Sequence, residues 1–274
     1  AALSPIQSVI CPDSGHVYAH EAGSIENTGH KLVPLPSTGG KISAEQIRKA
    51  AASYYNGGEP NYICEPKMVY ISFPTEWGTI YSEQELKEIR KVCDEYEMYL
   101  FVDGARLGYG LGSVKNDLTL EKLAELTDVF YIGGTKCGAL FGEALVITNK
   151  KLARKFRTYM KQNGAVLAKG WLLGMQFCAL LEDDTYEKMT AQADAYALEI
   201  KAAFTEKGIR EFGDSYTNQL FVILTEEQAE VLGKEYTFEH QQDLADGSKV
   251  VRFCTSWATT EAEKDQLIRD IRAL

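Results

Sequence analysis

The first two thirds of the sequence alternate short runs of β-branched and aromatic residues with amphipathic helical stretches. This alternation is typical of an α/β domain with a mainly parallel sheet, because parallel strands are joined by helical crossovers. Ser82 and Glu85 form a capping-box pattern, which predicts a helix that begins after Ser82. A helix is also expected over residues 43–53, and strands are expected over 8–11, 31–35, 67–73, 98–102, 129–132 and 144–148. We expect residues 1–180 to form this large domain.

The pattern changes after residue 180. Residues 183–207 predict a long amphipathic helix that ends at Gly208. Strands are expected over 219–224 and 249–254, and helices over 226–233 and from Glu261 onward. This order predicts a small C-terminal α+β domain over residues 181–274, packed rigidly against the first because no Pro/Ser-rich linker separates them.

Charge and composition narrow the range of partners. The 274 residues carry a net charge of -10, and no apolar run approaches the roughly 20 residues needed to cross a bilayer. We therefore expect binding to neither nucleic acid nor membrane. Six scattered cysteines without a Cys-x-x-Cys pair favour reduced thiols and a cytoplasmic location. The sequence begins without Met and without a signal-peptide pattern, so we expect it to be part of a longer chain.

Two polar clusters follow predicted strands, where ligands of open α/β sheets collect. Asp103 follows the strand 98–102, and Lys136 follows the strand 129–132 among small and apolar residues. An amine in such surroundings loses hydration, its pKa falls, and it can form a Schiff base. Asp103 can face the ring-nitrogen cation of pyridoxal phosphate. The alternatives are a solvated surface lysine and a helix N-cap aspartate.

Four segments of the sequence together resemble one known family. They surround His16 (residues 15–23), Asp103 (residues 101–107), Lys136 (residues 134–142) and Arg252 (residues 249–253). In this order they resemble the segments of the threonine aldolase and β-eliminating lyase family, over essentially the whole chain.

The resemblance implies the aspartate-aminotransferase-like fold (fold type I), with pyridoxal 5'-phosphate bound to Lys136 and Asp103 paired with its ring nitrogen. His16 would stack on the ring and act as a base or position a water. Arg106 would lie near a cofactor oxygen or the substrate. Arg252 would bind the substrate carboxylate through its planar fork, the alternative being a surface arginine on a strand. A homodimer or homotetramer with active sites near a subunit interface is also implied.

The sequence differs from the family pattern at three places. They affect the expected contacts with the substrate and the cofactor phosphate more than those with the cofactor ring. The sequence starts after the family's Gly-Thr-rich phosphate-binding turn. Glu76 stands where the family has a second histidine, and we expect it to contact the substrate. The Gly-rich loop at 163–170 contains no arginine.

The function implied is retro-aldol cleavage of a β-hydroxy-α-amino acid, of the L-threonine or L-allo-threonine type, to glycine and an aldehyde, with His16 or Glu76 as the base. Other reactions on the same cofactor, β-elimination and transamination, are the alternatives within the fold. A metal hydrolase using His16 and His20 is an alternative from other chemistry, although we expect no metal site. A nicotinamide site at residues 108–112 and a non-catalytic binding protein are further alternatives.

Several other residues are expected to be structural. Cys137 is expected to pack in the core, and His30 and His240 to be structural or solvent-facing. The apolar stripe Trp171, Leu172, Met175, Cys178 and Ala179 is expected to form a helix core or a subunit contact.

Overall fold

A six-stranded sheet forms the centre of the larger part of the computed structural model, which describes residues 1–274. The strand order is β2-β1-β3-β4-β5-β6; the first five of these strands are parallel, and β6 is antiparallel to β5. The six expected strands are confirmed as β1 (Gln7–Pro12), β2 (Lys31–Leu35), β3 (Glu65–Ser72), β4 (Tyr99–Asp103), β5 (Val129–Ile132) and β6 (Ala144–Ile147).

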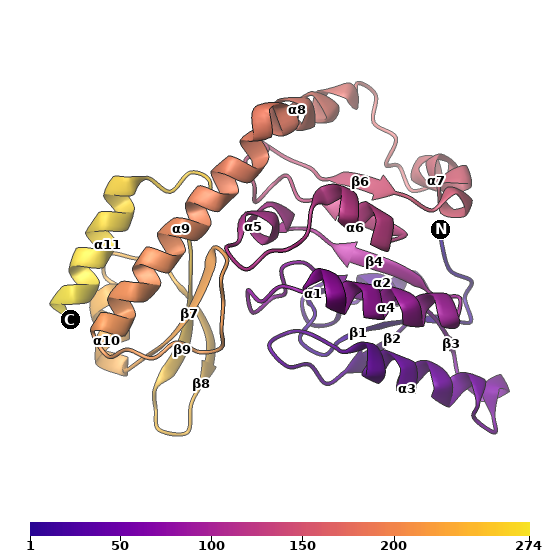
Figure 1. The fold of residues 1–274 in the computed structure, drawn as a ribbon, viewed down its shortest axis with the longest axis horizontal. Helices are drawn as coiled ribbons and strands as arrows, with labels where there is room; N and C mark the ends of the chain where they lie inside the picture. The colour runs from indigo at the N-terminus through magenta and orange to yellow at the C-terminus, as the bar shows by residue number, and fades with distance from the viewer.

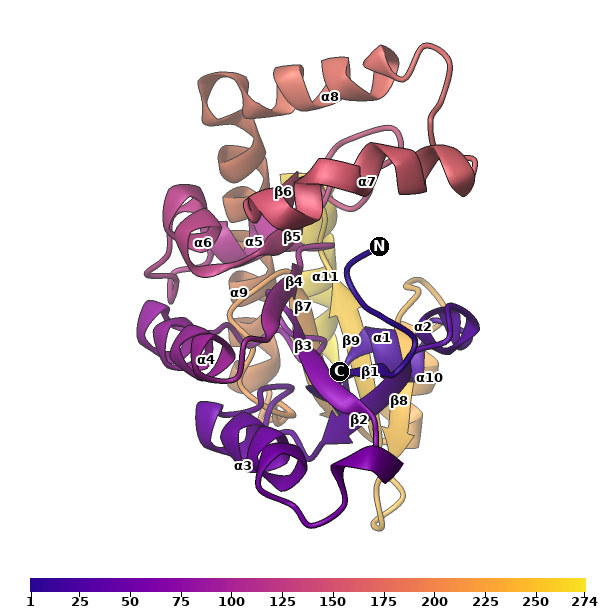
Figure 2. The ribbon, with the colours of Figure 1, turned by 90° about the vertical axis from the view of Figure 1, so that its right-hand side faces the viewer.

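Helices cover both faces of this sheet. Figure 2 shows α3 (Ala44–Tyr55), α4 (Glu83–Glu95) and α6 (Leu120–Leu126) on one side, and α1 (His16–Ala19) and α2 (Ser24–Asn27) on the other. The capping box at the start of α4 is confirmed, since Ser82 Oγ accepts from the Glu85 N–H and Glu85 accepts from the Ser82 N–H. This helix buries Leu86, Ile89, Val92 and Cys93 in the main core, as its helical spacing requires.

The glycines at 108, 110 and 112 lie in a short helix, α5 (Leu107–Gly112). A Cβ at Gly108 would lie 2.7 Å from Cγ2 of Thr190, and one at Gly112 would lie 2.8 Å from the Ala191 N. Both contacts are with the long helix α9 (Thr185–Glu206). The glycines therefore allow two helices to touch closely, and the alternative of a nicotinamide site at residues 108–112 is wrong.

A three-stranded antiparallel sheet, in the order β7-β9-β8, lies in the C-terminal part. Strands β7 (Gln219–Leu224) and β9 (Lys249–Cys254) and helices α10 (Glu226–Leu232) and α11 (Glu261–Ala273) are confirmed. The sequence EHQQD of β8 (Glu239–Asp243) gave no strand signal, because this edge strand is mostly exposed and polar. Figure 1 shows α9 running from the larger lobe into this smaller one.

Helix α9 belongs to two hydrophobic cores. Its residue Ala193 is part of the 27-residue core around the large sheet. Ile200 and Phe204 are part of the 12-residue core of the small sheet. Both halves of the chain therefore share one continuous helix, and the domain division at residue 180 stays a prediction.

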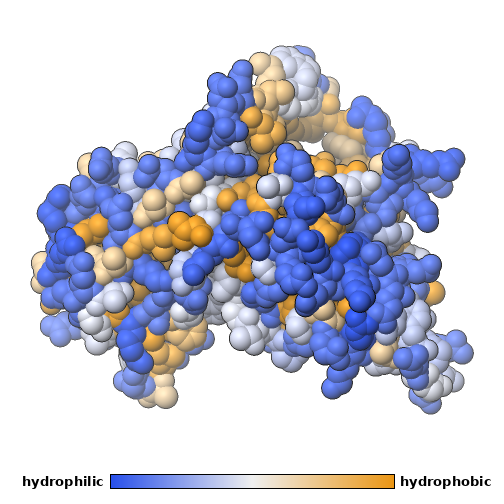
Figure 3. Space-filling view, viewed as in Figure 1, coloured by the Kyte–Doolittle hydropathy of each residue, from blue (hydrophilic) through white to orange (hydrophobic).

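Between β6 and α9 the chain forms α7 (Lys150–Gln162) and α8 (Trp171–Leu181), and two 3₁₀ turns occur at Pro60–Tyr62 and Glu182–Asp184. On α8, Trp171 is 60% exposed and Met175 is 58% exposed, so the helix-core interpretation of this stripe is wrong. The subunit-contact interpretation stays a prediction. Figure 3 shows apolar surface in the upper part of this view, around α8. None of the helices has the length and apolar character that crossing a membrane requires.

Candidate active site

Four strand ends bring the predicted residues to one edge of the large sheet. His16 follows β1, Glu76 follows β3, Asp103 ends β4 and Lys136 follows β5. The carboxyl ends of parallel strands meet at the same edge, and Ser72 at the end of β3 pairs in register with Asp103. The strand order therefore places these residues in one region, as the sequence predicted.

The Asp103 carboxylate is held by two hydrogen bonds. Its Oδ2 accepts from the Tyr70 hydroxyl at 3.0 Å, and its Oδ1 accepts from the Ala105 N–H at 3.0 Å. Burial and the Asp103 charge raise the pKa of the hydroxyls of Tyr70 and Tyr131, so both remain donors at neutral pH. The N-cap of the following helix is Arg106, so the N-cap alternative for Asp103 is wrong.

Lys136 lies in the turn between β5 and β6. The Tyr109 hydroxyl donates to the Lys136 carbonyl at 2.5 Å, which fixes the backbone of this turn. The residue itself is exposed, yet atoms around the amine displace part of its hydration shell. This desolvation, together with repulsion from Arg106, lowers the pKa of the Lys136 amine, in the direction expected from the sequence.

Charges from several elements act on the Lys136 amine. Asp103 and Glu143 raise its pKa, whereas Arg106 and Arg252 lower it. Such interactions require proximity, because charges separated by more than about 10 Å are screened in water at ordinary ionic strength. The ends of β4 and β5 are adjacent in the sheet, so Lys136 and Asp103 lie in the same region, and the charge of Arg252 on the small sheet also acts on this amine.

Glu76 has one oxygen engaged and one free. Its Oε1 accepts from the Ser72 hydroxyl at 2.6 Å and from the His16 N–H at 2.8 Å. Its Oε2 is buried and has no hydrogen-bond partner in the protein. Burial raises the pKa of Glu76, and the two hydrogen bonds oppose part of this rise. This oxygen therefore lacks a hydrogen-bond partner within the protein.

His16 opens α1 and is held by its neighbours. Its Nδ1 lies 2.6 Å from Oε1 of Glu21, and its ring centroid lies 5.3 Å from that of His20. The pairing with Glu21 leaves Nε2 as the free ring nitrogen. No group of three or more His, Cys, Asp or Glu side chains is placed to hold a metal ion.

Arg252 lies on β9, and its guanidinium contacts side chains of β7 and β8. Its Nη1 donates to Oε1 of Gln219 at 3.1 Å, and its Nη2 pairs with the exposed carboxylate of Glu239. Its Nε is buried and has no acceptor in the protein. With a side chain only 18% exposed, Arg252 differs from the surface-strand arginine of the alternative interpretation.

Some residues of the site were not predicted. Tyr70 could have been found from the period of two, because it lies two residues before Ser72 and therefore on the same face of the sheet. Gln219 gives no such signal, since its contacts depend on how the two sheets pack. Among the structural expectations, Cys137 is fully buried, whereas His240 is exposed and lies 2.9 Å from Asp243.

The architecture defines a class of enzymes, those of fold type I. The structure aligns with a variant of the Thermus thermophilus aspartate aminotransferase at a TM-score of 0.67, covering 99% of this chain and 71% of that one. The sequence identity is 13%, so this likeness concerns the fold alone. It confirms the predicted fold class.

The chain belongs to the beta-eliminating lyase family, whose family model matches residues 1–227. It is 33% identical to a low-specificity L-threonine aldolase of Pseudomonas sp. (strain NCIMB 10558), over 97% of this chain and 76% of that protein. It is 43% identical to a threonine aldolase of Leishmania major, whose structure aligns at a TM-score of 0.95 over 99% of this chain and 78% of that one. The resemblance inferred from the four segments is confirmed.

Proposed function

We propose that this chain is a pyridoxal-phosphate-dependent aldehyde lyase that cleaves a β-hydroxy-α-amino acid, such as L-threonine, to glycine and an aldehyde. Membership of the family and the two threonine aldolase relatives support this activity. The observation that carries it is the placement of Lys136 and Asp103 at neighbouring strand ends, where their charges interact.

The residues present fit the cofactor. Lys136 would hold it covalently through an amine whose lowered pKa favours the neutral, nucleophilic form. Asp103 would pair with the ring nitrogen, because its carboxylate is fixed by Tyr70 and the Ala105 N–H. When bound, pyridoxal phosphate supplies a protonated ring that withdraws the negative charge developing at Cα as the Cα–Cβ bond breaks. Arg106 would lie near a cofactor oxygen or the substrate.

Arg252 binds the substrate carboxylate in this proposal. Its buried Nε lacks an acceptor, and a buried unpaired donor costs free energy until a ligand pairs with it. Gln219 and Glu239 already orient the two Nη atoms. A carboxylate ligand would complete the set of acceptors around this guanidinium.

We assign the removal of the β-hydroxyl proton to Glu76. Its Oε2 is free and buried, and its raised pKa brings it closer to that of an effective base near neutral pH. His16 would stack on the cofactor ring, with its ring held by Glu21. It remains the alternative base through Nε2.

The assembly and location are also proposals. We expect a homodimer or homotetramer, supported by the exposed apolar residues of α8. Sedimentation of the purified protein tests this, and a monomer would contradict it. A cytoplasmic location is supported by the six cysteines, all of which are unpaired.

The activity is tested with the purified protein loaded with pyridoxal phosphate. L-threonine, L-allo-threonine and L-serine are supplied in turn, and aldehyde, glycine, ammonia and keto acid are measured. We expect aldehyde and glycine in equal amounts from a β-hydroxy amino acid, and loss of both products and of the visible absorbance band in Lys136→Ala. Ammonia with a keto acid as the main products would show β-elimination, and a full band in Lys136→Ala would show that another residue holds the cofactor.

A further inference from the structure

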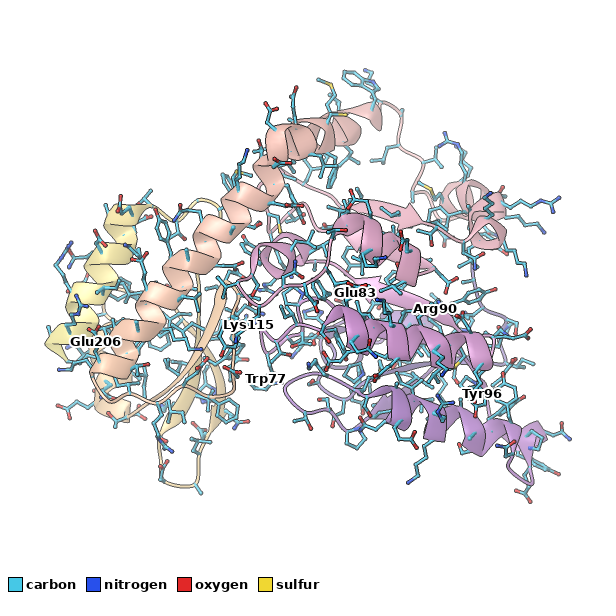
Figure 4. All side chains as sticks on the ribbon, in the orientation of Figure 1. Trp77, Glu83, Arg90, Tyr96, Lys115 and Glu206 are labelled. Carbon is cyan, nitrogen blue, oxygen red and sulfur yellow. The ribbon has the colours of Figure 1, made fainter.

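The loop after β3 is attached to the small sheet at several points. The Tyr216 N–H and the Thr217 hydroxyl donate to the Gly78 carbonyl at 3.4 and 3.5 Å. The ring of Trp77 lies 5.0 Å from that of Phe221 on β7. Figure 4 shows Trp77 at this boundary, with Lys115 nearby. Because Glu76 precedes Trp77, its position depends on these contacts.

Gln219 connects this loop to Arg252. Its Oε1 accepts from Nη1 of Arg252 at 3.1 Å, and its Nε2 donates to the carbonyls of Thr75 and Glu76 at 3.4 Å each. The residue is only 1% exposed, so water has little access to these groups. One buried amide therefore contacts two elements that the proposed function places on the substrate.

We propose that Gln219 is a positioning residue that fixes the Arg252 guanidinium relative to the Glu76 carboxyl, and so sets the distance between substrate carboxylate and β-hydroxyl that the site accepts. This inference rests on the proposed function. The geometry behind it is the pair of contacts made by the two ends of one amide, on opposite sides of the boundary between the sheets.

Only an amide satisfies both neighbours. Arg252 needs an acceptor and the Glu76 carbonyl needs a donor, whereas the Thr75 carbonyl also accepts from the Gly78 N–H at 2.9 Å; an amide offers both a donor and an acceptor. A carboxylate at this position would keep the contact with Arg252 but would place an oxygen against two carbonyls. An apolar side chain of similar length would satisfy neither, and buried polar groups left unpaired are costly.

Two variants separate these contacts. Gln219→Met removes both and keeps the length of the side chain. Gln219→Glu keeps the acceptor for Arg252, removes the donor and adds a negative charge beside the Glu76 backbone. Ser113→Ala is the matched control, because the Ser113 hydroxyl also crosses the boundary, donating to the Tyr216 carbonyl at 2.8 Å, without contacting Gln219, Arg252 or Glu76.

The measurements use the cofactor-loaded protein. The dissociation constant of glycine, read from the change in absorbance, reports the carboxylate contact of Arg252 without catalysis. For Gln219→Met we expect this constant and the KM of the β-hydroxy amino acid to rise about tenfold, the effect of losing one hydrogen bond to a charged group. For Gln219→Glu we expect a smaller rise in both constants. We also expect kcat/KM to fall on acidification (its acidic limb) at a higher pH than in the wild type, because the added charge disfavours the Glu76 carboxylate.

Several outcomes overturn the inference. Wild-type glycine binding and an unchanged acidic limb in both Gln219 variants would show that the amide positions neither group. Equal changes in Ser113→Ala would show a general effect of the boundary. Thermal unfolding of each variant shows whether it is folded. If Gln219→Met does not fold, the pH dependence of kcat/KM in Gln219→Glu tests the inference instead. If the wild-type protein binds glycine but cleaves no β-hydroxy amino acid, the proposed function fails while the glycine measurement still tests the Arg252 contact.

Discussion

The Tyr70 hydroxyl donates a 3.0 Å hydrogen bond to Oδ2 of Asp103 across the β3–β4 pair. The Tyr70 ring also stacks on Phe101 with centroids 4.7 Å apart, so the hydroxyl is fixed by packing as well as by its hydrogen bond. The carboxylate proposed to face the cofactor is therefore held in one orientation by a residue that need not touch the cofactor itself.

Replacing Tyr70 by Phe removes this hydrogen bond and keeps the ring. A hydrogen bond to a charged group contributes about 1.5–3 kcal/mol, so we expect Tyr70→Phe to lower kcat/KM at least about tenfold and to weaken cofactor binding. Steady-state kinetics and a cofactor titration measure both. Tyr55→Phe is the matched control, since its hydroxyl donates to Glu65 at 3.1 Å on the surface. Equal values for Tyr70→Phe and the wild type would contradict this role.

Substituting Glu76 tests the proton acceptor. Burial raises the pKa of Glu76, so the wild-type kcat/KM should fall on acidification at a pH above the usual range of a glutamate, as the carboxylate takes up its proton. Glu76→Gln cannot accept a proton, and we expect a loss of roughly 10²–10⁴ in kcat together with this acidic limb. Measurements of kcat and kcat/KM between about pH 4 and 9 test both expectations.

The exposed Glu187 on α9 provides the control, because Glu187→Gln makes the same change of charge away from the site. If Glu76→Gln retains the acidic limb and most of its rate, His16 is the base instead.

The parts of the site that lie on single strand ends could be predicted from the sequence. Asp103 and Lys136 each follow a run of strand-forming residues, and the parallel order of strands brings such ends together whatever the details of packing. The paired contacts of Gln219 could not be predicted, because they join β7 to a loop 143 residues away in sequence. The polar edge strand β8 was missed for a related reason, since its pairing with β9 leaves no hydrophobic alternation in its sequence.

The close contact of α5 with α9 gives a prediction about stability. A Cβ at Gly108 would meet Cγ2 of Thr190 at 2.7 Å and Cε1 of Tyr186 at 3.0 Å. We expect Gly108→Ala to lower the free energy of unfolding by about 1–3 kcal/mol, the usual cost of overpacking. Gly174 on α8 has no atom within 4 Å of such a Cβ, so Gly174→Ala should stabilise by about 0.5–1 kcal/mol through helix propensity. Urea unfolding compares the two, and a stabilised Gly108→Ala would contradict the packing.

Asp194 on α9 provides the last prediction. The residue is 2% exposed, and neither carboxyl oxygen has a side-chain partner. Burial raises the pKa of Asp194 to about 9, and the backbone N–H of Asn218 opposes part of this rise. The folded protein therefore keeps a proton that the unfolded chain loses near about pH 4. Below that pH the contribution of Asp194 to the free energy of unfolding is complete. Above it, this contribution falls by about 1.4 kcal/mol per pH unit until the pH passes the pKa of Asp194 in the folded protein.

Asp194→Asn stays neutral, and we expect it to be more stable than the wild type at pH 8 but similar at pH 4. Urea unfolding across this range measures the difference, with the exposed Asp183→Asn as control; parallel pH dependences of wild type and Asp194→Asn would show that Asp194 ionises at its ordinary pKa.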